Sequence, residues 1–381
     1  MQEQKSNEFE DIRPYRDDEV PAVLNGLFSN PIFCSVFWLG LKAAESGWNL
    51  SPKDIRKVND SFRQIKNAKN VDEFQWLLKE PVEGLIKRTI DDLTYSGLDN
   101  VSKDKNYLFV SNHRDIVMDP ALINYILKTN YYNTTAIATG SNLLNNRPIR
   151  DLMKLNKIFV IKRGVNGTKE KLNVMNTQSE FIHDYLTNKG SIWIAQREGR
   201  AKDGNDFTKS GLINMFSLAG KERGKTLTDT IINMNILPVS ISYEYDPLDI
   251  EKSRELFDKK NNGRHTKRFL EDISSMRKGI FGYKGRVNVA FGTQITQIDS
   301  KRGLAAEIDK QIITNYKIWP SNEVAYKIVK DIPPSSFEGG TIKFLDRREK
   351  VPFHLIDIFD EMYANPLINK MKYSNQNTIE A

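Results

Sequence analysis

From about residue 100 the chain alternates short apolar runs with longer stretches of helical pattern. The runs are rich in Val, Ile and aromatic side chains, and polar or glycine residues bound them, which is typical of buried strands. Strands that alternate with helices predict an α/β domain with a mixed, largely parallel sheet flanked by helices. The expected strands are 107–111, 157–161, 191–195, 236–243 and 287–291, and the expected helices are 120–128, 168–188, 209–220 and 252–277.

Three regions of the chain differ in sequence pattern. Residues 1–85 contain few β-branched runs and have a helical pattern. We therefore expect a helical N-terminal region at 1–85, an α/β domain at 86–330, and a C-terminal helix and tail at 331–381. The longest apolar run, residues 31–41, is too short to cross a membrane as a helix. It predicts either a helix that faces the core or a segment that rests on a membrane surface.

Cysteine content and charge narrow the chemistry. The single cysteine, Cys34, rules out a disulfide framework and a cysteine zinc site, and it favours a reducing compartment. The net charge is +7, and residues 141–225 hold 16 Lys and Arg against 8 Asp and Glu. A chain dedicated to nucleic acid carries basic stripes or a known module, and this sequence has neither. The localised surplus favours a phosphate pocket, and no nucleic-acid partner is expected.

One segment has the composition of a catalytic loop. His113 follows the expected strand at 107–111, and Asp119 and Pro120 come shortly after it. Asp suits the N-cap of a helix and Pro its first position, so we expect the next helix to begin there. A histidine oriented by a carboxylate can take a proton from a hydroxyl near neutral pH. The alternative is that Asp119 only caps the helix and His113 is a structural loop residue.

Three further segments end in unusual residues. The strand at 157–161 leads into Lys162 and Arg163, and an arginine in this position can bind a phosphate or simply be solvated. The strand at 191–195 leads into a loop that is rich in both acidic and basic residues. These charged side chains either bind a ligand or form surface ion pairs with one another. Pro238 lies in the run 236–243 and predicts a sheet edge or a strand start, because proline cannot donate to a ladder.

Taken together and in this order, the four segments resemble the glycerolipid acyltransferase family. Its first block, Asn-His-x4-Asp, is matched by Asn112, His113 and Asp119, although five residues separate His113 from Asp119 here. Asp115 is therefore a second candidate for the orienting carboxylate. The family's second block is matched by 159–163, ending in Arg163.

The third and fourth blocks of the family complete the resemblance. The third is matched from Glu198 and Gly199 through Arg200 and Lys202, with one residue fewer than the family has between Gly199 and Arg200. The fourth, an apolar strand with a proline, is matched by 237–243. Standard phosphate-loop, dinucleotide, zincin and nucleophile-elbow motifs are absent from the sequence.

The resemblance implies an acyltransferase without a metal or a bound cofactor. His113 would be the general base and Asp119 its orienting partner, while Glu198 would hold a glycerol hydroxyl, and Arg163, Arg200 and Lys202 would bind the acceptor phosphate beside Gly199. The donor would be a thioester of acyl carrier protein or coenzyme A. The acceptor would be glycerol-3-phosphate or its 1-acyl derivative.

The resemblance also implies a location, and it leaves alternatives open. A lipid product requires contact with a membrane surface, so we expect a peripheral protein on the cytoplasmic face of the cell membrane. Another lipid acceptor, such as an acylated amino acid, and a catalytically inactive lipid-binding relative are the remaining alternatives.

Overall fold

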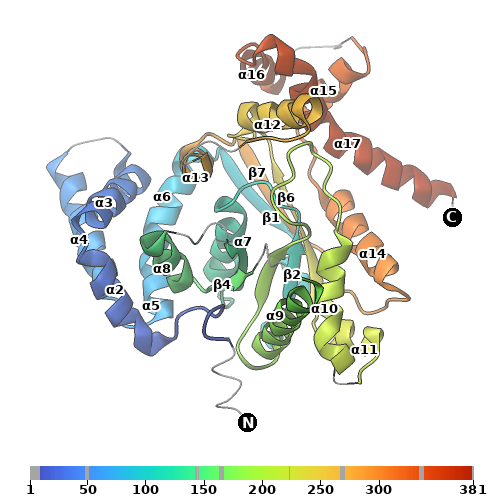
Figure 1. Cartoon of the computed structure of the whole chain (residues 1–381). Helices are drawn as coiled ribbons and strands as arrows, with labels where there is room; N and C mark the ends of the chain where they lie inside the picture. Colours follow the sequence, from blue (N-terminus) through green and yellow to red (C-terminus); the bar gives the residue numbers. More distant parts are fainter. Residues whose placement is uncertain are drawn as a thin grey trace.

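A single seven-stranded sheet forms the centre of the molecule in a computed structural model of the chain (Figure 1). The structure describes residues 9–47, 51–141, 144, 146–162, 167–222, 224–266, 271–333 and 339–379. The strand order is β1-β7-β6-β2-β5-β3-β4, and every neighbouring pair is parallel except β6 and β7. The strands are β1 (Asp92–Ser96), β2 (Leu108–Ser111), β3 (Ala136–Gly140), β4 (Ile158–Ile161), β5 (Ile192–Ala195), β6 (Ile236–Tyr243) and β7 (Arg286–Phe291). This architecture confirms the expected mixed, largely parallel sheet flanked by helices.

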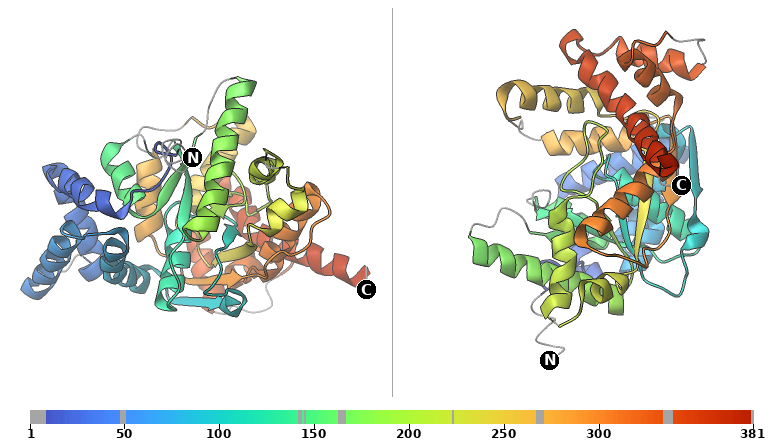
Figure 2. Two further views of the ribbon diagram at one scale, coloured as in Figure 1. Left: turned by 90° about the horizontal axis from the view of Figure 1, so that it is seen from below. Right: turned by 90° about the vertical axis from the view of Figure 1, so that its right-hand side faces the viewer.

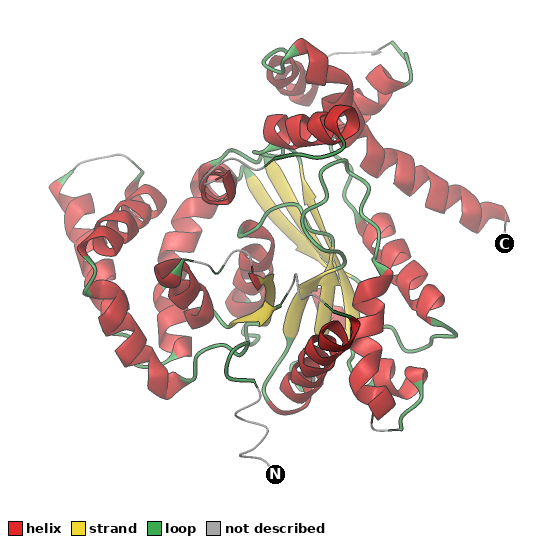
Figure 3. Ribbon diagram, in the orientation of Figure 1, coloured by secondary structure: helices red, strands yellow, loops and turns green. Residues whose placement is uncertain are grey.

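Helices cover both faces of the sheet (Figures 1 and 3). Side chains of β2 alternate between the two layers, since Leu108 and Val110 pack on one side and Phe109 on the other. One face carries α6 (Lys79–Thr89), α7 (Met118–Thr129), α8 (Arg147–Leu155) and α13 (Glu271–Phe281). The other carries α9 (Thr168–Asn188), α10 (Ser210–Glu222), α11 (Leu227–Ile232) and α14 (Lys301–Asn315). The pattern of buried residues thus places two cores around one sheet.

The N-terminal helices project from one side of the sheet domain (Figure 2). They have a core of their own, which includes Leu24, Val58 and Phe74 and is closed by Leu155 of α8. No single helix among the described residues is long and apolar enough to span a membrane; only the sharply bent pair Asp17–Phe28 and Pro31–Ser46 passes that test together. The elements are η1 (Asp17–Glu19), α2 (Val20–Phe28), α3 (Pro31–Ser46), α4 (Pro52–Lys66) and α5 (Val71–Leu77).

The C-terminal helices form a further packed layer, at the end of the molecule away from the N-terminal helices (Figure 2). The rings of Phe344, Phe359 and Tyr363 contact one another there, in one buried cluster with Tyr245, which follows β6. The elements are α12 (Asp249–Asn262), α15 (Pro320–Val329), α16 (Gly339–Arg348), η4 (Phe353–Leu355) and α17 (Ile356–Ile379), and η2 (Leu98–Asn100) lies near β7. The division of the chain at residues 86 and 331 stays a prediction.

Two details of the fold differ from expectation. The expected helix at 252–277 is two helices, α12 and α13, joined through Gly263, which has a left-handed φ of 70°. The prediction that Pro238 marks a sheet edge or strand start is wrong, because β6 lies inside the sheet and Pro238 is its third residue. The missing N–H is tolerated because pairing with β7 begins one residue later, at Val239.

Candidate active site

The candidate site lies at the carboxyl ends of β2 and β5 and beside β6, the other neighbour of β2. Hydrogen bonds hold together the loops that follow β2 and β5. The N–H of Gln196 donates to the carbonyl of Ser111 (2.8 Å), and the N–H of Ala201 donates to the carbonyl of His113 (2.9 Å). The amide of Asn112 bonds both backbone groups of Ile241 on β6, at 2.9 and 2.8 Å. The loop that carries His113 is therefore fixed from both sides of β2.

The structure brings His113 and Asp119 together. Nδ1 of His113 lies 2.8 Å from Oδ2 of Asp119, whose side chain is completely buried. The extra residue between them is accommodated because α7 begins at Met118, so Asp119 is its second residue. The expectation of an N-cap at Asp119 with Pro120 in the first helical position is wrong by two residues. The carboxylate instead turns back to the loop.

Asp119 is held by donors on both of its oxygens. Oδ2 accepts the backbone N–H groups of Arg114 (2.6 Å) and Asp115 (2.9 Å), and Oδ1 accepts the hydroxyl of Tyr243 (2.8 Å). Burial, together with the charges of Asp119 and Asp115, raises the pKa of Tyr243 well above its usual value. Tyr243 therefore stays protonated and remains a donor to the carboxylate.

Asp115, the alternative orienting carboxylate, has another role. Its Oδ1 accepts the N–H groups of Val117 (2.9 Å) and Met118 (2.8 Å), which caps the start of α7. Burial, reinforced by the nearby charge of Asp119, raises its pKa. Gly279 of α13 approaches so closely that a Cβ there would lie 2.0 Å from Oδ2 of Asp115. The carboxylate that His113 contacts is that of Asp119.

The imidazole of His113 also packs against an aromatic ring. The rings of His113 and Trp193 meet edge to face with centroids 5.5 Å apart, and Nε1 of Trp193 donates to the hydroxyl of Ser111 (2.9 Å). The side chain of His113 is 14 % exposed, so it is reachable from solvent although its carboxylate partner is not. The sequence did not single out Trp193 or Tyr243 as functional residues, because each lies inside an apolar strand, β5 and β6 respectively.

The loop after β5 carries four of the expected acceptor-binding residues. Gly199 has a left-handed φ of 73°, which requires glycine, and Glu198 beside it is exposed. Nη1 of Arg200 is buried without a hydrogen-bond partner in the structure. Lys202 does not face a vacant pocket, because its ammonium is ion-paired with Glu255 of α12. Arg163 lies outside the described residues.

The basic surplus of residues 141–225 does not form one pocket. Arg147 and Arg150 lie on α8, whereas Lys169 and Lys171 lie on α9 across the sheet. Lys157 and Lys162 pair with carboxylates of the N-terminal region, Asp72 at 3.1 Å and Asp11 at 3.2 Å. Among the described residues of that segment, the cations of the loop after β5 are Arg197, Arg200 and Lys202 with Lys209 at its end.

An apolar cavity of about 500 Å³ begins beside the histidine loop. Ile116, Val117 and Pro120 contribute to its wall at the start of α7, only three to seven positions after His113. The remaining wall comes from the rest of α7, from α5, α6, α8 and α13, and from the strands β3 and β4. Such a volume lies within the range of protein ligand sites. The sequence offered no direct signal for it, because its lining is spread over most of the domain.

Comparison with known proteins agrees with this geometry. Residues 92–242 match the family model described as Acyltransferase, and this span contains the loops after β2 and β5 and nearly all of β6. The chain is therefore an acyltransferase enzyme. The matched part of the chain, residues 92–242, resembles the Acyltransferase family, as the four segments predicted. No match is found among curated proteins.

Two solved structures show weaker likeness. One is the 1-acyl-sn-glycerophosphate acyltransferase PlsC from Thermotoga maritima, with 14% identity, a TM-score of 0.36, and coverage of 77% of this chain and 91% of that chain. The other is the signal recognition particle receptor FtsY from Elizabethkingia anophelis in complex with GDP, with 14% identity, a TM-score of 0.23, and coverage of 68% and 78%. Neither score carries an argument about substrates.

Proposed function

We propose that this acyltransferase moves a fatty acyl group from an acyl thioester to a hydroxyl of glycerol-3-phosphate or of its 1-acyl derivative, in phospholipid biosynthesis. The observation that carries the proposal is the histidine–carboxylate dyad in a segment whose neighbouring residues, Ile116, Val117 and Pro120, line an apolar cavity. The dyad supplies a base for a hydroxyl group, and the cavity suits a long alkyl chain.

In the proposed reaction His113 acts as general base. With its Nδ1–H directed at Asp119, the imidazole presents Nε2 to the acceptor hydroxyl. As the hydroxyl oxygen attacks the thioester carbonyl carbon, Nε2 takes its proton, the new C–O bond forms and the C–S bond breaks. The imidazolium then returns the proton to the leaving thiolate. No acyl-enzyme is needed, which agrees with the distance in sequence between Cys34 and every site segment.

The acyl chain would occupy the cavity next to the dyad. Part of its wall is formed by Val117, which directly precedes α7, by Ala121 of α7, and by Met276 and Ile280 of α13. Burial of a chain there is favourable by about 0.8 kcal/mol for each methylene group removed from water. The thioester carbonyl would then stay at the end of the cavity that Ile116 and Val117 line, within reach of His113.

The acceptor would be held by the loop after β5. Glu198 would bind a glycerol hydroxyl, and Arg200, with Lys202 and Arg163, would bind the phosphate beside Gly199. Arg200 supports this role because its Nη1 is buried and has no hydrogen-bond partner in the structure, which is costly unless a ligand supplies one. Besides the acceptor, this scheme requires one further substrate, the acyl thioester of acyl carrier protein or of coenzyme A.

Contact with the membrane would be made by the N-terminal helices. Ile32, Val36 and Leu39 of α3 form a row on one helix face and are 76%, 64% and 47% exposed. Exposed cations, including Lys53 and Arg56, lie on the adjoining helix α4. An apolar row beside basic residues is typical of a helix that rests on an anionic membrane surface. We accordingly propose peripheral attachment to the cytoplasmic face of the cell membrane.

The test is a product analysis with the purified chain. Labelled acyl thioester, carried on acyl carrier protein or on coenzyme A, is offered with glycerol-3-phosphate, 1-acylglycerol-3-phosphate or an N-acylated amino acid, and the lipid products are separated. We expect a product from one of the two phosphorylated acceptors. Transfer to the amino-acid lipid alone would contradict the acceptor assignment, and no transfer from either donor would contradict the activity.

His113→Ala tests the assigned base. Loss of a general base lowers a rate by about 10²–10⁴-fold, so we expect kcat to fall by that factor while circular dichroism shows a folded protein. His354→Ala, which removes an exposed histidine on η4, is the matched control and should keep full activity. Unchanged activity in His113→Ala would refute the mechanism.

A further inference from the structure

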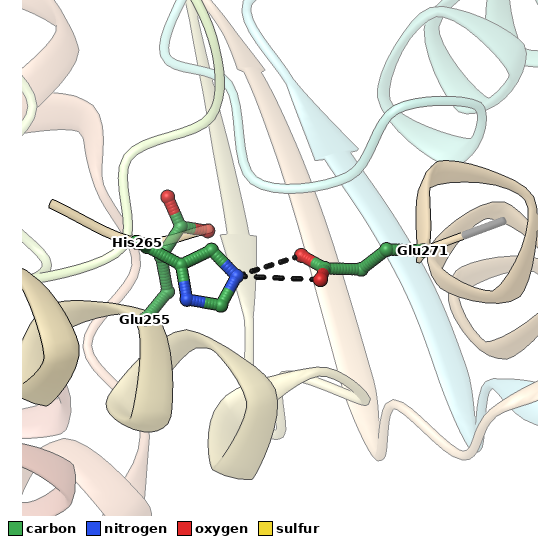
Figure 4. Close-up of side chains that lie close together, drawn as sticks. All are labelled: Glu255, His265 and Glu271. Atoms are coloured by element: carbon green, nitrogen blue, oxygen red, sulfur yellow. Dashed lines mark hydrogen bonds and ion pairs between the residues drawn. The ribbon is translucent and has the colours of Figure 1, made fainter. Parts of the chain in front are cut away.

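A second group of polar side chains gathers outside the proposed active site, between α12 and α13. Glu255 belongs to α12, His265 to the segment after it, and Glu271 to the first turn of α13. One potential ligand atom of each residue lies within 4.8 Å of those of the other two. Figure 4 shows the imidazole with a carboxylate on either side. We propose that these three side chains bind a divalent metal ion of the zinc type.

The orientation of His265 supports a metal site. Its Nδ1 lies 2.7 Å from Oδ2 of Asp258. Its Nε2 lies 3.1 and 3.3 Å from the two oxygens of Glu271 (Figure 4). Metal-binding histidines usually have their second nitrogen hydrogen-bonded to a carboxylate, which fixes the tautomer and the ring plane. Asp258 already supplies that contact, so Nε2 is directed at the place where the ion would lie.

The donor set and its burial suit the same ion. One imidazole and two carboxylates are three protein ligands, and a water completes the four-coordinate geometry of zinc. The side chains of His265 and Glu255 are only 11% and 12% exposed.

The site has a direct connection to the proposed acceptor pocket. Glu255 is the residue that pairs with Lys202, and Lys259 contacts the same oxygen at 2.8 Å. A metal ion on Glu255 competes with these ammonium groups for the carboxylate. Lys202 then becomes available to the acceptor phosphate, so the bound ion favours acceptor binding. This last step rests on the proposed function, whereas metal binding itself does not.

Direct binding is measured on the whole chain after treatment with a chelator and removal of the chelator. Zn²⁺ is titrated by calorimetry, and Co²⁺ by its visible absorption, which reports the coordination geometry. We expect one equivalent of Zn²⁺ and a Co²⁺ spectrum of low coordination number. In His265→Ala and Glu271→Gln the affinity should fall by at least tenfold. His354→Ala removes a histidine outside the cluster and should bind as the unaltered chain does.

The outcomes separate the two parts of the proposal. Absent binding, or equal binding by the unaltered chain and His265→Ala, would overturn the metal site. If the site is correct, Zn²⁺ should lower the KM for the phosphorylated acceptor several-fold in the unaltered chain and leave it unchanged in His265→Ala. An equal KM with and without bound Zn²⁺ would refute the link through Lys202. If no acceptor is acylated, the proposed function fails, and the two titrations still decide the metal site.

Discussion

At the scale of single residues, the position of Asp119 is overdetermined. Two backbone N–H groups, His113 and the hydroxyl of Tyr243 all contact its carboxylate, which has no exposure to water. A buried carboxylate with this many partners cannot rotate without losing several hydrogen bonds at once. The imidazole therefore meets a carboxylate in a fixed position, and we expect Tyr243 to act through Asp119 as a positioning residue.

Tyr243→Phe tests this positioning role. The ring keeps its packing, and the loss of one hydrogen bond costs about 1 kcal/mol, so we expect kcat to fall about fivefold. A carboxylate with one donor fewer attracts the imidazolium proton more strongly. Less unprotonated base is then available, and the acid limb of the kcat profile should move to higher pH by roughly half to one pH unit.

A matched control separates positioning from general destabilisation. Tyr132→Phe also removes one tyrosine hydrogen bond, to the carbonyl of Val101 (3.1 Å), just beyond the end of α7 opposite to Asp119. It should leave both kcat and its pH dependence unchanged. A Tyr243→Phe enzyme with an unshifted pH profile would show that the hydroxyl does not act through Asp119.

The pairing of His113 with Asp119 was predictable because only five residues separate them, so the order of residue types already limits the geometry. Tyr243 was not, since it reaches Asp119 from 124 positions away. The same holds for the partner of Lys202 in this structure, Glu255, which lies 53 positions later. Local patterns indicate the type of site, and long-range pairing decides which charges are already occupied.

At the scale of elements, the apolar strands were predictable and the polar ones were not. The five expected strands correspond to β2, β4, β5, β6 and β7, each dominated by branched or aromatic side chains. The two that were missed are β1, which has the polar sequence DLTYS, and β3, which has the small residues AIATG. Pairing with β7 and with β4 and β5 holds these two in place, which no pattern inside the strands themselves expresses.

Ala121→Phe tests the cavity between α7 and α13 as the acyl site. A benzyl group at Ala121, which lines the cavity, takes up space that the end of a long chain would need. Each excluded methylene costs about 0.8 kcal/mol, so exclusion of two lowers kcat/KM about tenfold for a long-chain thioester relative to a short one.

The control for this variant is Ala306→Phe, which adds the same group at an exposed position of α14 on the other face of the sheet. Its chain-length preference should equal that of the unaltered enzyme. An Ala121→Phe enzyme that keeps the original preference and is folded would place the acyl chain elsewhere.

At the scale of the whole molecule, the cavity and the N-terminal helices lie on the same side of the sheet. The cavity is lined in part by Gln75 of α5 and by Leu78, which connects α5 to α6. Leu155 of α8 closes the core of the N-terminal helices. The cavity and the N-terminal helices are therefore neighbours on one side of the sheet. If α3 contacts the membrane as proposed, a lipid product formed at the dyad would have its apolar end on the side of the sheet that carries these helices.

Ile32→Glu tests this arrangement. Burial of a single isoleucine side chain in the bilayer stabilises the membrane-bound state by about 1.5–3 kcal/mol, and a charge in its place adds a desolvation cost. We therefore expect partitioning onto anionic liposomes to fall at least tenfold in a flotation assay at low salt.

Ile342→Glu is the matched control, because Ile342 of α16 is also exposed, at 51%, and lies among the C-terminal helices away from α3. That variant should float like the unaltered chain. Equal loss in both variants would indicate a general effect of added negative charge, and unchanged flotation of Ile32→Glu would show that α3 does not contact the membrane.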